Sequence, residues 1–183
     1  MTTLAPAPGI QISLSPSAEA LVFMGPGQPP APIAVAEVPL REGEALASIE
    51  LATVCGSDVH TVHGHRSALG PQVLGHEQVG RIVALGPGEP AQTIDGHPLH
   101  VGDRILWGVC VACGDCARCL RGMPNKCAVV QKYGHAQVRR GWELTGGLAT
   151  HTHLLRRTAI IRVPEHLPAE LLAPASCATA TIA

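Results

Sequence analysis

Five cysteines in one short stretch carry the most distinctive chemistry of this sequence. They follow the pattern Cys-x2-Cys-x2-Cys-x2-Cys-x7-Cys and are Cys110, Cys113, Cys116, Cys119 and Cys127. Four thiolates in a tetrahedron hold a structural zinc ion, and short spacings let the chain wrap around the metal. The bacterial ferredoxin run, which binds an iron–sulfur cluster, ends in x3, a cysteine and a proline, whereas here the last short gap is x2 and Leu120 follows. The run therefore predicts a zinc site that uses four of the five cysteines, and a visible colour would instead indicate iron.

A second set of residues has the types needed for a reactive metal site. Its members are spread over three segments, and they are Cys55, Asp58, His60, His76, Glu77 and Cys177. Two cysteines and a histidine are ligand types of a catalytic zinc ion, which keeps a fourth position open for water or substrate. A single cysteine, however, is more often a small buried apolar residue. Residue types alone therefore leave open whether these three segments meet.

Short strands and turns must position these residues, because the chain contains 20 glycines and 16 prolines. Apolar and alternating runs predict strands over residues 31–38, 45–54, 77–85, 101–111, 147–155 and 159–163. Residues 53–63 suit a loop with one helical turn, and a helix is expected to begin within residues 168–182. Residues 112–145 lack any pattern, and a metal would organise such a long irregular region. The expected fold class is mainly β.

Composition excludes several classes of function. The formal net charge is −1 and only 2% of residues are aromatic, which argues against a nucleic-acid partner. No run approaches the roughly 20 apolar residues of a membrane span, so no membrane partner is expected. Residues 1–11 lack the positive charges and apolar core of a signal peptide. We therefore expect a cytoplasmic location, where cysteines stay reduced.

Four motifs follow one another in a fixed order along the chain. They are Cys55-Gly-Ser-Asp-Val-His60, Gly75-His-Glu-x2-Gly80-x5-Gly86, Gly102-Asp-Arg104 and Cys113-x2-Cys-x2-Cys-x7-Cys127. Their order and spacing resemble the zinc-dependent alcohol dehydrogenases of the medium-chain dehydrogenase/reductase family, over about residues 20–183. The resemblance implies a GroES-like barrel with a cysteine-rich structural zinc lobe, followed by the start of an α/β Rossmann domain. It also implies two zinc ions, NAD or NADP as cofactor, a small-molecule alcohol as substrate, and a homo-oligomer.

The same resemblance assigns the metal ligands. The residues that match the structural zinc ligands are Cys113, Cys116, Cys119 and Cys127. The residues that match the catalytic zinc ligands are Cys55, His76 and Cys177, and Cys177 lies in Ala173-Pro-Ala-Ser-Cys-Ala. Glu77 matches a carboxylate beside the ligand histidine that approaches the metal in some members. Cys110 is left over and is expected near the substrate pocket.

The remaining roles implied by the resemblance concern proton movement. Ser57 matches the hydroxyl that takes the proton of the substrate, and His60 matches the histidine that relays it toward solvent. Asp58 matches the carboxylate that orients the ligand histidine. Ser57 and His60 are thus the expected catalytic residues.

The resemblance also suggests how the chain is divided. Residues 1–18 are expected to be a flexible arm, residues 19–172 the catalytic domain with its zinc lobe at about 110–130, and residues 173–183 the start of a connection to a cofactor domain. No G-x-G-x-x-G follows a strand, as a dinucleotide site requires. We therefore expect the catalytic portion of an alcohol dehydrogenase that is inactive without its Rossmann domain. The alternative is a free-standing zinc-binding GroES-like module without dehydrogenase activity.

One polar segment after the first motif gives an indication of the substrate class. His63, His65 and Arg66 form either a solvated loop or a site for an anionic or polyhydroxy alcohol, because arginine favours phosphate and carboxylate oxygens. Together with residues 21–27 and 132–135, this segment is similar to a subgroup of the family associated with phosphonate breakdown.

Overall fold

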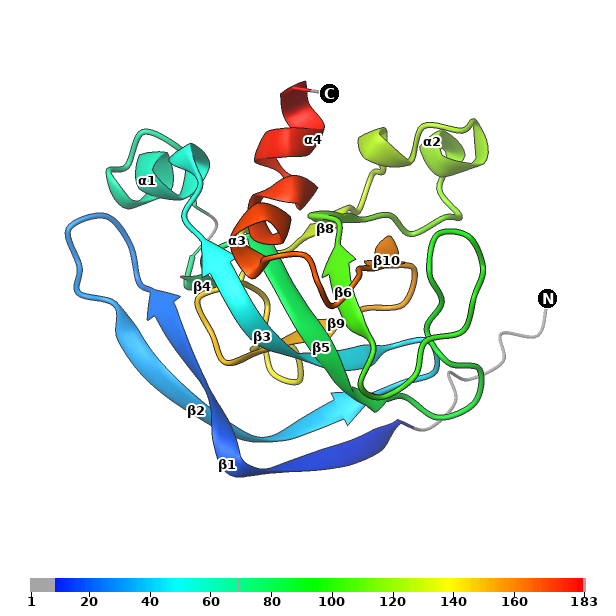
Figure 1. The fold of residues 1–183 in the computed structure, drawn as a ribbon. Helices are drawn as coiled ribbons and strands as arrows, with labels where there is room; N and C mark the ends of the chain where they lie inside the picture. The colour runs from blue at the N-terminus through cyan, green and yellow to red at the C-terminus, as the bar shows by residue number, and fades with distance from the viewer. Residues whose placement is uncertain (1–8, 69, 183) are drawn as a thin grey trace.

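The computed structural model describes residues 9–68 and 70–182, and strands dominate it (Figure 1). A three-stranded antiparallel sheet has the order β2-β1-β4. Its strands are β1 (Ile10–Phe23), β2 (Ala31–Leu40) and β4 (Gln72–Val73). The mainly β prediction is confirmed, including the strand predicted over residues 31–38.

The prediction of a flexible arm over residues 1–18 is wrong for residues 10–18. These residues form the first part of β1, where Ile10 lies opposite Leu40 of β2. The pairing shifts between Ser13 and Ala18, around a proline that cannot donate to a strand ladder. Ala18 is fully buried. The Ala, Pro and Ser composition suggested an arm, although apolar residues alternate on either side of the proline. Residues 1–8 lie outside the described part of the chain.

A five-stranded antiparallel sheet has the order β10-β6-β5-β3-β9. Its strands are β3 (Ala45–Thr53), β5 (Glu77–Leu85), β6 (Arg104–Trp107), β9 (His151–Leu154) and β10 (Ile160–Arg162). The strands predicted over residues 45–54 and 77–85 are confirmed almost to the residue, and the other three are shorter than predicted. Gly80 pairs within β5, where an added Cβ would lie 2.2 Å from the carbonyl oxygen of Ser48. Glycine therefore allows a close approach of two strands here.

Both faces of the five-stranded sheet are buried. On β3, Ala45 and Ala47 pack into one core cluster while Leu46 packs into another, as expected for side chains that alternate between faces. The three-stranded sheet is tied to the segment before β9, where the Leu21 amide donates to the Leu148 carbonyl at 2.9 Å. Among the described residues the strands form three separate sheets, and no single closed barrel is formed.

The remaining elements are short and gather at one end of the molecule (Figure 1). The small sheet there pairs β7 (Cys110–Val111) with β8 (Gln131–Lys132). The helices are α1 (Gly56–Val62), α2 (Ala117–Leu120), η1 (Pro124–Lys126), α3 (Ala169–Leu172), η2 (Ala173–Ser176) and α4 (Ala178–Ile182). No helix of the described chain is long and apolar enough to cross a membrane. Leu172 and Ala173 pack on Val79 and Leu106 of the five-stranded sheet. This packing brings the segment that carries Cys177 over the start of β5.

Candidate metal centres

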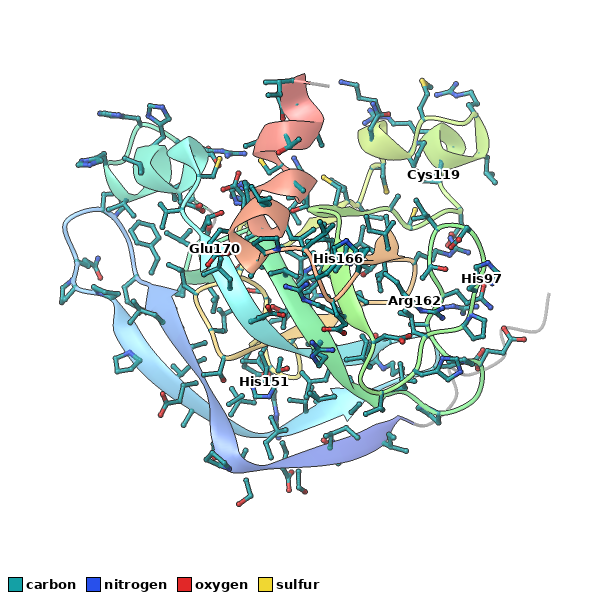
Figure 2. The ribbon with its side chains drawn as sticks, in the orientation of Figure 1. His97, Cys119, His151, Arg162, His166 and Glu170 are labelled. Carbon is teal, nitrogen blue, oxygen red and sulfur yellow. The ribbon has the colours of Figure 1, made fainter. Side chains whose placement is uncertain are left out.

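Four cysteines of the lobe between β7 and β8 come together around one point. The ligand atoms of Cys113, Cys116, Cys119 and Cys127 all lie within 4.8 Å of one another. The Sγ atoms of Cys116 and Cys119 are 3.5 Å apart, and Cys119, at α2, is labelled in Figure 2. Four bonds of about 2.3 Å in a tetrahedron would put the sulfurs about 3.8 Å apart. All four cysteines are free, so their number, donor type and spacing fit a zinc ion.

Backbone amides support these sulfurs. The Cys113 amide donates to Cys127 Sγ at 3.3 Å, and the Cys116 amide donates to Cys113 Sγ at 3.4 Å. Hydrogen bonds from the backbone of Ala128 and Cys119 lower the pKa of Cys116 to about 6. Burial and the neighbouring sulfurs raise the pKa of Cys119 to about 12. A divalent cation would favour the thiolate form of every ligand.

Cys110 does not belong to this group. It lies exposed on β7 opposite Lys132 of β8. Four of the five cysteines of the run therefore form the cluster, and Cys110 lies outside it.

A second group forms where three distant segments meet. The ligand atoms of Cys55, His76 and Cys177 lie within 4.8 Å of one another, and the two Sγ atoms are 4.0 Å apart. Cys55 is the residue before α1, His76 precedes β5, and Cys177 follows η2. Two thiolates and an imidazole make a three-ligand set with a fourth position open, which suits a catalytic zinc ion.

Asp58 connects two of these segments. Its carboxylate accepts hydrogen bonds from the Cys55 amide at 3.0 Å and from the Gly75 amide at 3.2 Å. Its Oδ1 atom also lies 3.4 Å from Nδ1 of His76. Burial alone would raise the pKa of Asp58, but His76 and the two amides hold it below its usual value. One buried carboxylate thus fixes both ligand-bearing segments and faces the imidazole nitrogen that is not needed for a metal.

Two glycines allow the chain to cross itself closely beside His76. Gly75 has a φ of 87° and Gly134 a φ of 73°, which side chains rarely adopt. A Cβ on Gly134 would lie 2.5 Å from the Gly75 carbonyl oxygen. These glycines therefore hold the segment containing His135 against the segment containing His76.

Glu77 lies beside this group but outside it. It is buried, and its Oε2 accepts a hydrogen bond from Thr53 Oγ1 at 2.9 Å, while Oε1 has no partner in the described chain. Burial and the neighbouring Cys55 and Glu77 raise the pKa of Cys177 to about 11. A buried carboxylate oxygen without a partner, close to a pair of thiols, fits a site completed by a cation.

Ser57 and His60 occupy different positions relative to this group. Ser57 Oγ lies 3.4 Å from Nε2 of His76, so it borders the group directly. His60 is exposed, and its ring centroid is 5.9 Å from that of His65. Within the described residues no hydrogen bond joins Ser57 to His60.

A cavity of about 560 Å³ lies next to the second group. Arg66, Lys132, His135 and Arg139 line it, and we refer to it as the cationic cavity. The ring of His135 is 4.7 Å from the ring of His76. Burial, helped by the positive charge of His76 and Arg66, lowers the pKa of His135 to about 4. Cys110, expected near the substrate, does not line this cavity.

Sequence reasoning missed Arg139 as a lining residue of the cationic cavity. It lies in a pattern-free region, which is held in place by contacts with a distant segment: Gln137 bridges Gln72, and the Val138 amide donates to the Pro71 carbonyl at 2.8 Å. The segment containing Lys132 and His135 was noticed only through a family resemblance.

Comparison with known proteins agrees with this arrangement. The family model described as "Alcohol dehydrogenase GroES-like domain" matches residues 41–165, more than half of the chain. The chain is 35% identical over 150 residues to a 5-exo-hydroxycamphor dehydrogenase from Pseudomonas putida, covering 80% of this chain and 40% of that protein. The chain thus spans about 40% of the length of that curated relative.

Solved structures show the same fold. An alcohol dehydrogenase from Thermotoga maritima superposes with a TM-score of 0.79 at 31% identity, over 94% of this chain and 46% of that one. A short chain alcohol dehydrogenase from Escherichia coli, solved with NADH, gives a TM-score of 0.66 at 26% identity, over 86% and 42%. The subgroup associated with phosphonate breakdown stays a prediction. The chain belongs to the alcohol dehydrogenase GroES-like domain family of the medium-chain dehydrogenases/reductases, whose zinc-type members are its relatives.

Proposed function

We propose that this chain is the zinc-bearing catalytic portion of an NAD(P)-dependent alcohol dehydrogenase. The observation that carries the proposal is the convergence of Cys55, His76 and Cys177 from three distant segments, with Ser57 beside them. The relatives are dehydrogenases, and this chain spans about 40% of the length of one of them, so the activity is proposed for the whole enzyme.

The residues of this chain divide the work at the proposed catalytic centre. Zinc held by Cys55, His76 and Cys177 would lower the pKa of the hydroxyl of a bound alcohol. Ser57 Oγ is suited to accept the hydroxyl proton, because it lies 3.4 Å from Nε2 of His76, one of the three proposed ligands. His60 is exposed on the same helix and is proposed to pass the proton to solvent through an intervening water or hydroxyl, because no hydrogen bond joins it directly to Ser57 in the described residues. A nicotinamide cofactor, when bound to the whole enzyme, would supply the hydride acceptor, so that the product would be an aldehyde or ketone.

The proposed role of the second zinc ion is structural. Cys113, Cys116, Cys119 and Cys127 would fill all four positions of the metal, leaving none for substrate. The lobe between β7 and β8 contains only α2 and η1, so it has little packing of its own. Glu77 is proposed to stay beside the catalytic zinc as a neighbouring carboxylate that can approach it.

Finer features of the whole enzyme are also proposed. We infer that it is a homo-oligomer, as its family implies, and that it works in the cytoplasm, which suits a chain with seven free cysteines. Its substrate is proposed to be an anionic or polyhydroxy alcohol, since Arg66 lines the cavity beside the metal ligands.

The test is an assay on the protein isolated at its natural length. It is supplied with zinc, NAD or NADP and a panel of alcohols, and formation of the reduced cofactor is followed by absorbance. We expect turnover that is lost in Cys55→Ala and lowered about 10²–10⁴-fold in Ser57→Ala. Cys110→Ala, at an exposed cysteine outside both groups, should keep the activity. Zinc-loaded protein that binds the cofactor and oxidises no alcohol would refute the proposal.

A further inference from the structure

The cationic cavity has an unusual balance of charge. Three of its lining residues are Arg66, Lys132 and Arg139, and none is an aspartate or glutamate. The chain as a whole has 13 Lys and Arg residues against 14 Asp and Glu residues. A general basic character of the protein therefore cannot explain why positive charge collects in this cavity.

Among the described residues these three cations have no ion-pair partner, a state they share with five other arginines, whereas four arginines are paired. Carboxylates pair with Arg81, Arg104, Arg157 and Arg162. Across residues 9–68 and 70–182, no ion pair involves a cation of the cavity. Three like charges around one space repel each other, and an anion between them would remove that cost.

One cation is already held in place. The guanidinium of Arg139 lies 4.5 Å from the ring centroid of Trp142 and donates to Gln131 Oε1 at 3.3 Å. Trp142 is itself buried, and its Nε1 donates to the His153 carbonyl at 3.0 Å. Lys132 lies on β8 beside Gln131. This wall of the cavity is thus fixed by the fold, which lowers the entropy cost of binding.

The size and lining of the cavity restrict the ligand. About 560 Å³ suits a small molecule, and the lining residues include no Phe, Tyr or Trp on which a base would stack. Arginine offers paired donors that match the oxygens of a phosphate, and lysine adds a point charge. A small molecule with a tetrahedral oxyanion matches these features.

We propose that the cationic cavity binds the phosphate-type group of the substrate, with Arg66, Lys132 and Arg139 as its specificity-determining residues. The connection to the substrate rests on the proposed dehydrogenase function; the binding of an oxyanion does not. His135 lines the cavity and its ring lies 4.7 Å from the ring of His76, at a tilt of 37°, so the cavity neighbours the metal ligands. In this proposal one small molecule places its anionic end in the cavity and its hydroxyl at those ligands. The substrate class is therefore a short phosphorylated or phosphonylated alcohol.

The binding test uses the 183-residue chain and two probes. Inorganic phosphate and glycerol 1-phosphate are titrated by calorimetry and by amide NMR shifts, with glycerol as the uncharged comparison. We expect both anions to bind, glycerol not to bind, and the shifts to centre on residues 131–139. Arg66→Gln and Lys132→Gln should each weaken binding about 5–10-fold, since each removes a charge-assisted contact.

The control is Arg140→Gln, which changes an exposed arginine next in sequence to Arg139 that does not line the cavity. It should leave binding unchanged. Because Arg139 packs on Trp142, Arg139→Lys is compared with Arg139→Gln. The lysine variant keeps the positive charge, so only the glutamine variant should bind the anions more weakly. Equal loss in Arg140→Gln, or no binding by the folded wild-type chain, would overturn the proposal.

An activity test on the enzyme at natural length separates the two proposals. A preference for glycerol 1-phosphate over glycerol in kcat/KM that disappears in Lys132→Gln supports the anion site. Turnover of neutral and phosphorylated alcohols with equal kcat/KM overturns the substrate assignment while the dehydrogenase function stands. Phosphate binding by an enzyme that oxidises no alcohol overturns the dehydrogenase function while the oxyanion site stands.

Discussion

Replacing Asp58 by asparagine should weaken zinc binding at the proposed centre of Cys55, His76 and Cys177 and leave zinc binding by the cysteine lobe unchanged. The carboxylate accepts the amides of Cys55 and Gly75 and faces Nδ1 of His76, so all of its neighbours are donors or cationic. An asparagine has one acceptor oxygen, and its NH2 group would point at a donor. At least one buried N–H loses its partner, which costs about 1–3 kcal/mol.

The expected loss of zinc affinity follows from the same contacts. Removal of a group that orients a metal ligand typically lowers affinity about 10–100-fold. That range equals about 1.4–2.7 kcal/mol, which agrees with the cost of one unpaired buried amide. These two estimates of the lost binding free energy are independent. One is the cost of a buried amide that loses its hydrogen-bond partner, and the other is the typical effect of removing a group that orients a metal ligand.

The assay is competition for zinc with a coloured chelator, followed until both centres are emptied. In Asp58→Asn we expect one of the two zinc ions to leave at a lower chelator concentration, while the ion of the cysteine lobe leaves as in the wild type. Asp95→Asn, at an exposed aspartate in the loop after β5, is the matched control and should change neither step. Unchanged affinity at both centres in a folded Asp58→Asn protein would refute the reasoning.

Three further outcomes are expected. Tyr133→Phe should lower the free energy of unfolding in urea by about 1–3 kcal/mol, since the fully buried hydroxyl accepts the Leu155 amide at 2.8 Å; an unchanged midpoint would contradict this. The pKa of Glu44 lies below its ordinary value of 4.5, because hydrogen bonds from His153 and a backbone amide outweigh burial. The stability it contributes is present above pH 4.5 and is lost as the pH falls through its lower folded value, so acid unfolding should be less steep in Glu44→Gln. Cys116→Ala should make the lobe sensitive to protease in the presence of zinc, and equal resistance in wild type and variant would exclude a structural metal there.

The sequence was informative where local spacing decides the outcome. The x2 gaps between Cys113, Cys116 and Cys119 are short enough to surround one metal whatever the rest of the chain does. The run over residues 77–85 is long and apolar enough to specify β5 almost to the residue. The density of glycine and proline and the short alternating runs likewise predict a mainly β fold.

The sequence was less informative where distant segments meet. Cys55 and Cys177 are 122 positions apart, and only the packing of Leu172 and Ala173 on the sheet brings their sulfurs to 4.0 Å. The Ala, Pro and Ser composition predicts an arm over residues 10–18, whereas these residues form the first part of β1, where Pro16 interrupts the alternation of apolar residues. Arg139 of the cationic cavity left no periodic signal, since irregular backbone positions it. A sequence motif can identify a metal-ligand residue, but the residues that surround the site are determined by tertiary contacts.

The most direct test of two separate metal centres is the zinc content of the purified chain, measured by mass spectrometry of the metal. The two groups predict two zinc ions per chain, one ion in Cys55→Ala, one in Cys116→Ala, and two in the control Cys110→Ala. A wild-type chain with one zinc ion that Cys55→Ala keeps would contradict a metal centre formed by Cys55, His76 and Cys177, and the proposed catalytic role of this chain would fall with it.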